Sequence, residues 1–250
     1  MSFLCESSVS LCVKRAVSQS DTEMHRVSQF LKNKTIRILL GRFETDRKEM
    51  ISLLETKGIT DPDVLAAMAK VERHLFVEAP FVNRAYEDSA LPIGYEQTIS
   101  QPYTVAYMTQ ALAPKPGDKI LEVGTGSGYQ AVVLAKMGCR VFTIERHLGL
   151  LAEARKMFDK LNLRIASKGG DGTVGWNEFA PFDGIIVTAG APDVPESLKQ
   201  QLADGGRLVI PVGDREVQKV IVMRRAGDSF LTEETFGFKF VPLVGKNGWS

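Results

Sequence analysis

The sequence predicts an α/β fold with a doubly wound, mostly parallel sheet. From Lys119 onward, short apolar runs alternate with helical segments, which is the element order of a parallel sheet with crossover helices. The first of these runs also leads directly into a glycine-rich turn that opens a helix. With 250 residues and 44% hydrophobic content, the chain is large enough for one sizeable core.

Residues 1–43 differ from the rest because they are rich in serine and basic residues and carry no motif. We expect them to form a poorly ordered N-terminal extension, or to precede a true start at Met24 or Met50. Glu6 interrupts their apolar positions and no basic segment comes before them, which is a poor signal peptide. Residues 44–250 are predicted to form a single domain.

Helices are expected ahead of the sheet. A helical pattern begins at Asp46 and is interrupted by Gly58, and Asp61 and Pro62 then open a second helix as N-cap and first helical residue. An irregular stretch at 79–100 precedes a third helix at 102–113. In the remainder we expect strands at 119–123, 140–144, 164–166, 182–188, 208–211, 217–223 and 236–243. Helices are expected at 129–137, 150–161 and 195–202, the last closed by Gly205-Gly206.

Composition limits the function. Lys plus Arg (31) nearly balances Asp plus Glu (30), so a net charge of +1 gives no overall attraction to nucleic acid or anionic membrane. No apolar run reaches membrane-spanning length. The three cysteines are widely spaced and form no C-x-x-C pair, which argues against a disulfide framework or a zinc site. We therefore expect a cytoplasmic protein without metal, nucleic acid or membrane partners.

The strongest motif comes after the strand at 119–123. Glu122 precedes glycines at 124, 126 and 128, with Thr125 and Ser127 between them. Alternating glycines let the backbone pass close to a ligand at the N-terminus of the next helix. A dinucleotide site requires G-x-G-x-x-G, and Tyr129 occupies the position of its last glycine. E-x-G-x-G-x-G resembles motif I of the class I S-adenosylmethionine (AdoMet)-dependent methyltransferases, which have a Rossmann-like fold.

Two further loops agree with this resemblance. Glu145, followed by Arg146, ends the next strand about 20 residues after the glycine loop, where a carboxylate accepts hydrogen bonds from ribose hydroxyls. Asp171 and Gly172 come after the third strand, in the loop that reaches the adenine in a methyltransferase fold. An NAD-dependent oxidoreductase is the alternative for this half of the chain, and it accounts for Glu145 but not for the glycine spacing.

The segment before the glycine loop is more specific. It reads Leu91-Pro92-Ile93-Gly94, then Gln97-Thr98-Ile99-Ser100-Gln101-Pro102, and Phe240-Val241-Pro242-Leu243-Val244-Gly245 comes near the end of the chain. These strings closely resemble the protein-L-isoaspartate O-methyltransferases over residues 46–249. The resemblance implies a methyltransferase catalytic domain at 44–250 that uses AdoMet to methylate the free α-carboxylate of L-isoaspartyl residues in damaged proteins and peptides, which begins repair through a succinimide.

The resemblance also implies roles for individual residues. Ser100 matches the active-site serine of the family, although it precedes Pro102 and is also suited to capping the helix there. Ala191, Pro192 and Val244 are expected, with Ser100, to contact the substrate. The expected cofactor-binding residues are Thr98, Ile99, Gln101, Glu122, Gly124, Thr125, Gly126, Ser127, Gly128, Glu145, Arg146, Asp171 and Gly172.

The chemistry is consistent with these residues. An α-carboxyl titrates at roughly 3.3–3.7, so the acceptor is already ionised at neutral pH and needs no general base. The expected partners are isoaspartyl proteins or peptides, and we expect the enzyme to be a monomer. A methyltransferase of another carboxylate, or of nucleic acid, remains an open alternative on the sequence alone.

Overall fold

The computed structural model describes residues 41–250, and its internal contacts divide the chain into two units, 1–46 and 47–250. The predicted N-terminal extension lies outside the described residues except for 41–43, which are helical. The second unit contains all the predicted motifs, from the Leu91–Gly94 string to the C-terminal segment.

Helices and short turns come before the sheet, as predicted. Residues 47–56 are helical, and the N-cap Asp61 accepts hydrogen bonds from the backbone of Asp63 (2.9 Å) and Val64 (3.3 Å). The next elements are α2 (Pro62–Lys70), η1 (Arg73–Phe76), η2 (Ala79–Arg84), β1 (Leu91–Pro92), β2 (Thr98–Ile99) and α3 (Pro102–Leu112). The antiparallel pair β1–β2 gives order to the stretch expected to be irregular.

A seven-stranded sheet forms the centre of this unit, with the order β5-β4-β3-β6-β7-β8-β9. Neighbours from β5 to β7 run parallel, whereas β8 and β9 are antiparallel. The strands are β3 (Lys119–Val123), β4 (Arg140–Glu145), β5 (Ala166–Gly169), β6 (Phe182–Val187), β7 (Leu202–Gly213), β8 (Gln218–Ala226) and β9 (Ser229–Phe238). This confirms the predicted α/β class.

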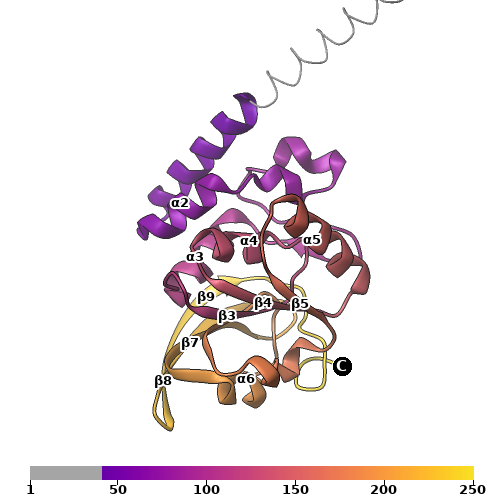
Figure 1. Cartoon of the computed structure of the whole chain (residues 1–250). Helices are drawn as coiled ribbons and strands as arrows, with labels where there is room; N and C mark the ends of the chain where they lie inside the picture. The colour runs from indigo at the N-terminus through magenta and orange to yellow at the C-terminus, as the bar shows by residue number, and fades with distance from the viewer. Residues whose placement is uncertain (1–40) are drawn as a thin grey trace, which may run out of the picture. The chain divides into compact units, whose positions relative to one another are not determined.

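Helices cover both faces of the sheet, so its central strands are buried on both sides. α3, α4 (Tyr129–Lys136) and α5 (Leu148–Lys160) lie on one face and α6 (Glu196–Gln200) on the other (Figure 1). In β3, Ile120, Leu121 and Val123 are at most 1% exposed. A strand of a parallel sheet that is buried on both faces has a continuous run of apolar residues rather than an alternating pattern, which explains the apolar run at 119–123.

Three expected elements are placed differently. The third strand, expected at 164–166, is β5 at Ala166–Gly169, and its pairing with β4 runs from Phe142 and Ala166 to Glu145 and Gly169. Gly205-Gly206 does not close a helix: α6 ends at Gln200, and both glycines lie within β7, where Gly206 packs so tightly that a Cβ would meet the Asp183 carbonyl at 2.8 Å.

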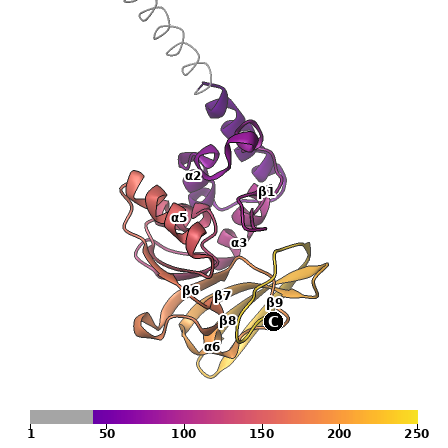
Figure 2. The ribbon, with the colours of Figure 1, turned by 90° about the vertical axis from the view of Figure 1, so that its right-hand side faces the viewer.

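The last strand is the third difference. β9 covers Ser229–Phe238 and pairs with β8, so the strand expected at 236–243 mostly falls after it. Figure 2 shows β8 and β9 on the side of the unit away from α5. Residues 239–244 instead make isolated bridges, including Gly190 with Pro242. Apolar residues alone did not distinguish a strand from a buried loop.

Candidate active site

A cavity lies at the carboxyl ends of β3, β4 and β6, which is the edge where parallel sheets bind ligands. It contains an empty volume of about 930 Å³, part of which is open to solvent. Its walls come from 97–100, from α3, from the loops after β3, β4 and β6, and from 241–244. The glycine motif and the Ser100 segment, separate in sequence, therefore contribute to one cavity.

The glycine loop packs against the loop after β6. Gly124 has a φ of 98°, and a Cβ on it would lie 2.3 Å from Thr188 Oγ1. The Thr188 hydroxyl donates a hydrogen bond to the Gly124 carbonyl (2.7 Å). Gly128, with a φ of 86°, is the N-cap of α4. Glycine is therefore required at 124 both for its backbone conformation and for the close approach of Thr188.

Glu145 connects the loop after β3 to the loop after β4. Its side chain is 6% exposed, and its oxygens accept hydrogen bonds from the backbone N–H groups of Gly126 (2.9 Å) and His147 (2.8 Å). A carboxylate has further lone pairs on each oxygen, so both contacts leave room for hydroxyl donors from a ligand in the cavity. The carboxylate thus holds the loops in place and still faces the cavity.

Glu122 lies beneath the loop in a buried polar chain. Thr125 and Thr143 share a hydrogen bond between their hydroxyls (2.6 Å), and Thr143 donates to Glu122 Oε2 (2.5 Å). Glu122 is 0% exposed and its Oε1 has no hydrogen-bond partner. Burial, aided by the nearby charge of Glu145, raises the pKa of Glu122 to about 8. The carboxyl is therefore mostly protonated at neutral pH, and Glu122 is one of the residues that line the cavity.

Ser100 lines the same cavity but does not cap α3. The N-cap is Gln101, which makes no side-chain capping bond, and the free backbone N–H of Tyr103 is bound by Asp88 Oδ1 (2.8 Å). The capping role considered for Ser100 is therefore wrong, because a carboxylate from a distant loop satisfies the helix terminus. The Ser100 carbonyl instead accepts a hydrogen bond from Arg73 Nη2 (2.8 Å).

The C-terminal segment 241–244 forms another part of the cavity wall. Gly190 donates to the Val241 carbonyl (2.8 Å), and its own carbonyl accepts from Leu243 N (2.8 Å) and Trp249 Nε1 (3.0 Å). These bonds hold 241–244 across the end of the sheet, with Val244 lining the cavity. Gly190, after β6, therefore fixes this wall through both its N–H and its carbonyl.

Most residues expected at the site line this cavity. Among the expected residues, those on its walls are Thr98, Ile99, Ser100, Glu122, Gly124, Thr125, Gly126, Ser127, Glu145, Arg146, Gly172 and Val244. Gln101, Gly128, Asp171, Ala191 and Pro192 lie outside the lining. Ala191 is fully buried in a bridge with Val212, behind the wall.

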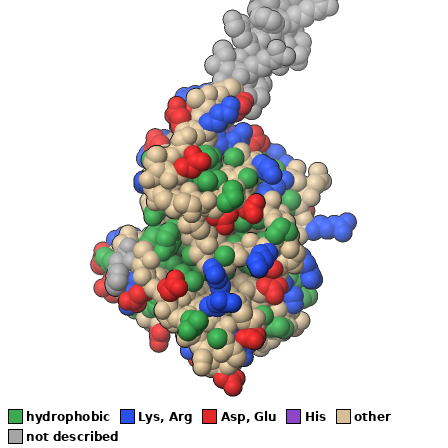
Figure 3. Space-filling model, turned by 90° about the vertical axis from the view of Figure 1, so that its left-hand side faces the viewer, with side chains coloured by type: hydrophobic (Ala, Val, Ile, Leu, Met, Phe, Trp, Pro, Cys, Tyr) green, Lys and Arg blue, Asp and Glu red, His purple; other side chains and the backbone are tan. Residues whose placement is uncertain are grey.

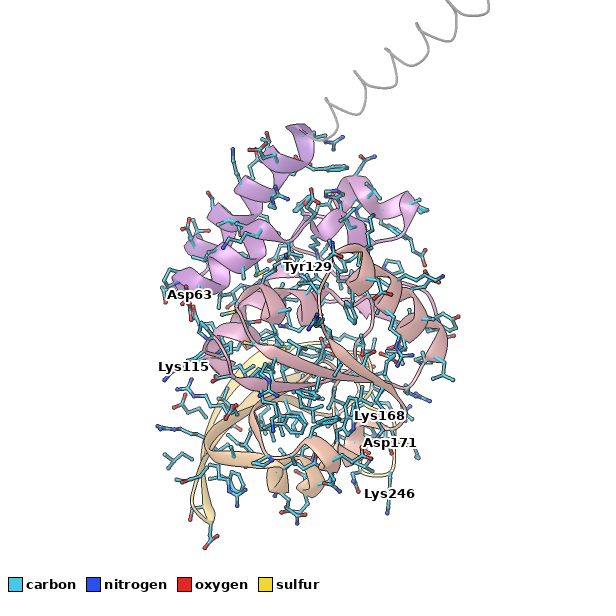
Figure 4. The ribbon with its side chains drawn as sticks, viewed as in Figure 1. Asp63, Lys115, Tyr129, Lys168, Asp171 and Lys246 are labelled. Carbon is cyan, nitrogen blue, oxygen red and sulfur yellow. The ribbon has the colours of Figure 1, made fainter. Side chains whose placement is uncertain are left out.

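Asp171 supports the C-terminal loop. One carboxylate oxygen accepts from the backbone and hydroxyl of Thr173 (2.8 and 2.7 Å), and the other accepts from Lys246 N (2.8 Å). Figure 4 shows Asp171 and Lys246 close together at this edge of the unit. Desolvation alone would raise the pKa of Asp171, but these hydrogen bonds, with the charge of Arg146, lower it overall.

Comparison with known proteins identifies the family. The family model described as protein-L-isoaspartate(D-aspartate) O-methyltransferase matches residues 45–248. The chain belongs to this family. A protein-L-isoaspartate O-methyltransferase from Chlorobaculum tepidum is 54% identical over 206 residues, which cover 82% of this chain and 97% of the relative. One from Dictyoglomus thermophilum is 48% identical, covering 83% and 94%.

Solved structures of the isoaspartate methyltransferases are similar as well. One has a TM-score of 0.73 at 25% identity and covers 81% of this chain and 67% of its own. Another, from Plasmodium falciparum and in complex with S-adenosyl-L-homocysteine, has a TM-score of 0.69 at 26% identity, with coverages of 79% and 98%. The predicted family and the methyltransferase fold class are both confirmed.

Other cavity-lining residues of this family member were not predicted from the sequence. On α3, Thr104, Val105 and Met108 face the cavity. Their spacing marks one face of a helix, but the same spacing describes an ordinary core stripe. Tyr129, the first residue of α4, also lines the cavity. Nothing in the local sequence separates these side chains from packing residues.

Proposed function

We propose that this chain transfers the methyl group of AdoMet to the free α-carboxylate of L-isoaspartyl residues in proteins and peptides. One observation carries the proposal: Ser100 of the acceptor segment lines the same cavity as the glycine loop and Glu145. Donor and acceptor sites within one cavity are what a direct methyl transfer requires.

The cavity is suited to AdoMet. Gly124 leaves no room for a side chain beside Thr188, so backbone rather than side chain faces the ligand there. Glu145 keeps lone pairs for the ribose hydroxyls, and the unpartnered Oε1 of Glu122 is a buried polar atom in need of a hydrogen-bond partner. When bound, AdoMet supplies the electrophilic methyl group of a sulfonium.

The acceptor needs orientation rather than activation. Its α-carboxylate is already ionised near pH 7, with a pKa of roughly 3.3–3.7, so no residue has to remove a proton. The Ser100 hydroxyl donates a hydrogen bond that fixes the direction of one carboxylate oxygen. Holding the reacting atoms in line contributes up to roughly 7–11 kcal/mol to such a reaction.

Exclusion of water also favours the reaction. Methyl transfer joins an anion and a cation into neutral products, so a dry cavity destabilises the charged ground state. Val241, Leu243 and Val244 give the cavity that Ser100 lines an apolar wall, held in place by Gly190. This wall is our proposed contact surface for the peptide around the isoaspartyl residue. Ala191 is fully buried and Pro192 is exposed outside the cavity lining, so the proposed surface does not include them.

We propose that the substrates are proteins and peptides, and that the enzyme is a monomer located in the cytoplasm. Acidic and basic side chains are interspersed on the face that Figure 3 shows. Such a face gives no directed attraction to a polyanion. Among the described residues, no helix combines the length and apolar character needed to cross a membrane.

The test is methyl transfer from labelled AdoMet to a synthetic isoaspartyl peptide, beside the normal aspartyl peptide. We expect label on the isoaspartyl peptide alone. Ser100→Ala should lower the rate by about tenfold or more, since it removes a hydrogen bond to a charged group, without changing AdoMet affinity. Ser229→Ala, an exposed change at the start of β9, is the matched control. Equal labelling of both peptides, or none, would contradict the proposal.

A further inference from the structure

Arg73 is a fully buried cation that the proposed mechanism does not use. It opens η1 and is 0% exposed. Its Nε donates to the Ala85 carbonyl (2.8 Å) and its Nη2 to the Ser100 carbonyl (2.8 Å). The guanidinium thus connects η1 and the residue after η2 to the acceptor serine.

The charge of Arg73 has no ion-pair partner among the described residues. Asp88 is the nearby carboxylate, but it is occupied by Lys57 Nζ (2.5 Å) and by the backbone of Tyr103. The Nη1 of Arg73 is buried and makes no hydrogen bond at normal distance, and the neutral side chain of Tyr129 is the polar neighbour that partly stabilises the charge. Burying an uncompensated charge is costly, so its presence in a well-packed region calls for a counterpart.

Arg73 lies directly behind the cavity wall. Its Cζ is 4.8 Å from the ring centroid of Tyr129, and both Tyr129 and Ser100 line the cavity. Figure 4 shows Tyr129 between the sheet and the helices above it. Burial raises the pKa of Tyr129 to about 12, so the ring stays neutral and leaves the arginine charge in place. Tyr86, which with Asp88 also acts on the Arg73 charge, has a pKa raised by burial as well.

We propose that Arg73 is a positioning residue for the acceptor: it holds Ser100 by its carbonyl, and its unpaired charge favours an anion over a neutral group on the Ser100 side of the cavity. This inference rests on the proposed function. The isoaspartyl α-carboxylate is the missing counter-charge. It does not touch Arg73, and the two charges interact electrostatically across the wall residues Ser100 and Tyr129. The normal aspartyl peptide presents a neutral amide at that point of the backbone and gains nothing from the charge.

The test compares two peptides of the same sequence, with AdoHcy (S-adenosyl-L-homocysteine) present so that no turnover occurs. One carries the isoaspartyl α-carboxylate and the other its neutral α-amide. We expect Arg73→Met to weaken binding of the acid by about tenfold, or 1.4 kcal/mol, relative to the amide. Arg73→Lys, which keeps the charge but lacks the planar fork that donates to both carbonyls, should retain most of the preference for the acid.

Controls separate positioning from folding. Arg207 also donates to a backbone carbonyl, that of Ala111 (3.1 Å), away from the cavity lining, so Arg207→Met should leave the acid-to-amide ratio unchanged. AdoHcy affinity and circular dichroism report whether each variant is folded; if Arg73→Met does not fold, Arg73→Gln replaces it as the neutral variant.

The outcomes distinguish this inference from the proposed function. Equal losses for acid and amide in the neutral Arg73 variants would show a structural role alone and overturn the inference. Failure of the unmodified enzyme to methylate the isoaspartyl peptide would instead refute the proposed function.

Discussion

The buried carboxyl of Glu122 should make the stability of the apoenzyme depend on pH in a characteristic way. Glu122→Gln is the appropriate change, because the amide oxygen can accept the Thr143 hydroxyl as Oε2 does, and the amide NH₂ replaces the protonated Oε1. The substitution preserves shape and removes only the ability to ionise.

The magnitude comes from the pKa. Burial raises the pKa of Glu122 from 4.5 to about 8, so between these values the unfolded chain is ionised while the folded protein keeps its proton. The unfolded state then binds fewer protons, and stability falls as pH rises, by about 1.4 kcal/mol per pH unit. The total loss is about 5 kcal/mol by pH 8, and about 4 kcal/mol at pH 7.5. Below pH 4.5 both states are protonated and Glu122 contributes no pH dependence.

The assay is urea unfolding of the wild type and the variant at several pH values from 4.5 to 8.5, without AdoMet. The free energy of unfolding of the variant should exceed that of the wild type by a margin that grows with pH up to about 8 and then stays constant. Glu153→Gln, on the exposed face of α5, is the control and should show no such growth. Parallel curves for wild type and Glu122→Gln between pH 5 and 8 would refute the reasoning.

Three further predictions concern the loops around the cavity. Gly124→Ala should weaken AdoMet binding by more than about tenfold, measured by calorimetry, because its Cβ would overlap Thr188; Gly227→Ala has a positive φ but open space around it, and should leave affinity unchanged. Glu145→Gln should raise the AdoMet dissociation constant about tenfold, since a charge-assisted acceptor is lost. Asp171→Asn should lower the free energy of unfolding at pH values above the ordinary aspartate pKa, and this difference from the wild type should shrink as pH falls through the lowered pKa of the folded protein. Urea unfolding midpoints of variant and wild type that differ equally at pH 3 and pH 7 would contradict this.

The sequence predicted the parts of the fold that local rules determine. β3 runs from Lys119 to Val123 as expected, and Asp61 caps α2, because a buried apolar run and an N-cap followed by proline are specified within a few residues. The cavity walls made by the glycine loop and Glu145 were also predicted, since both come directly after strand ends.

Tertiary contacts explain what the sequence did not reveal. Asp88 binds the backbone of Tyr103 from 15 positions away, so the helix start gave no sign that Ser100 was free of a capping role. Arg73 stands in an ordinary charged stretch, and its burial depends on Ala85 and Ser100 coming together around it. Contacts of this kind depend on which distant segments pack together, and they leave no periodic pattern in the sequence.

The contact between Gly124 and Thr188 links positions that lie 64 residues apart. Neither residue can be judged alone: a side chain at 124 meets the hydroxyl at 188 in addition to the strain of its φ of 98°, and a smaller residue at 188 would relieve only the steric part while leaving the Gly124 carbonyl without its donor. The two sites should therefore show strong epistasis. Libraries made to alter the donor specificity of this enzyme would need to randomise both positions together, because scanning either one singly would discard combinations that function only as a pair.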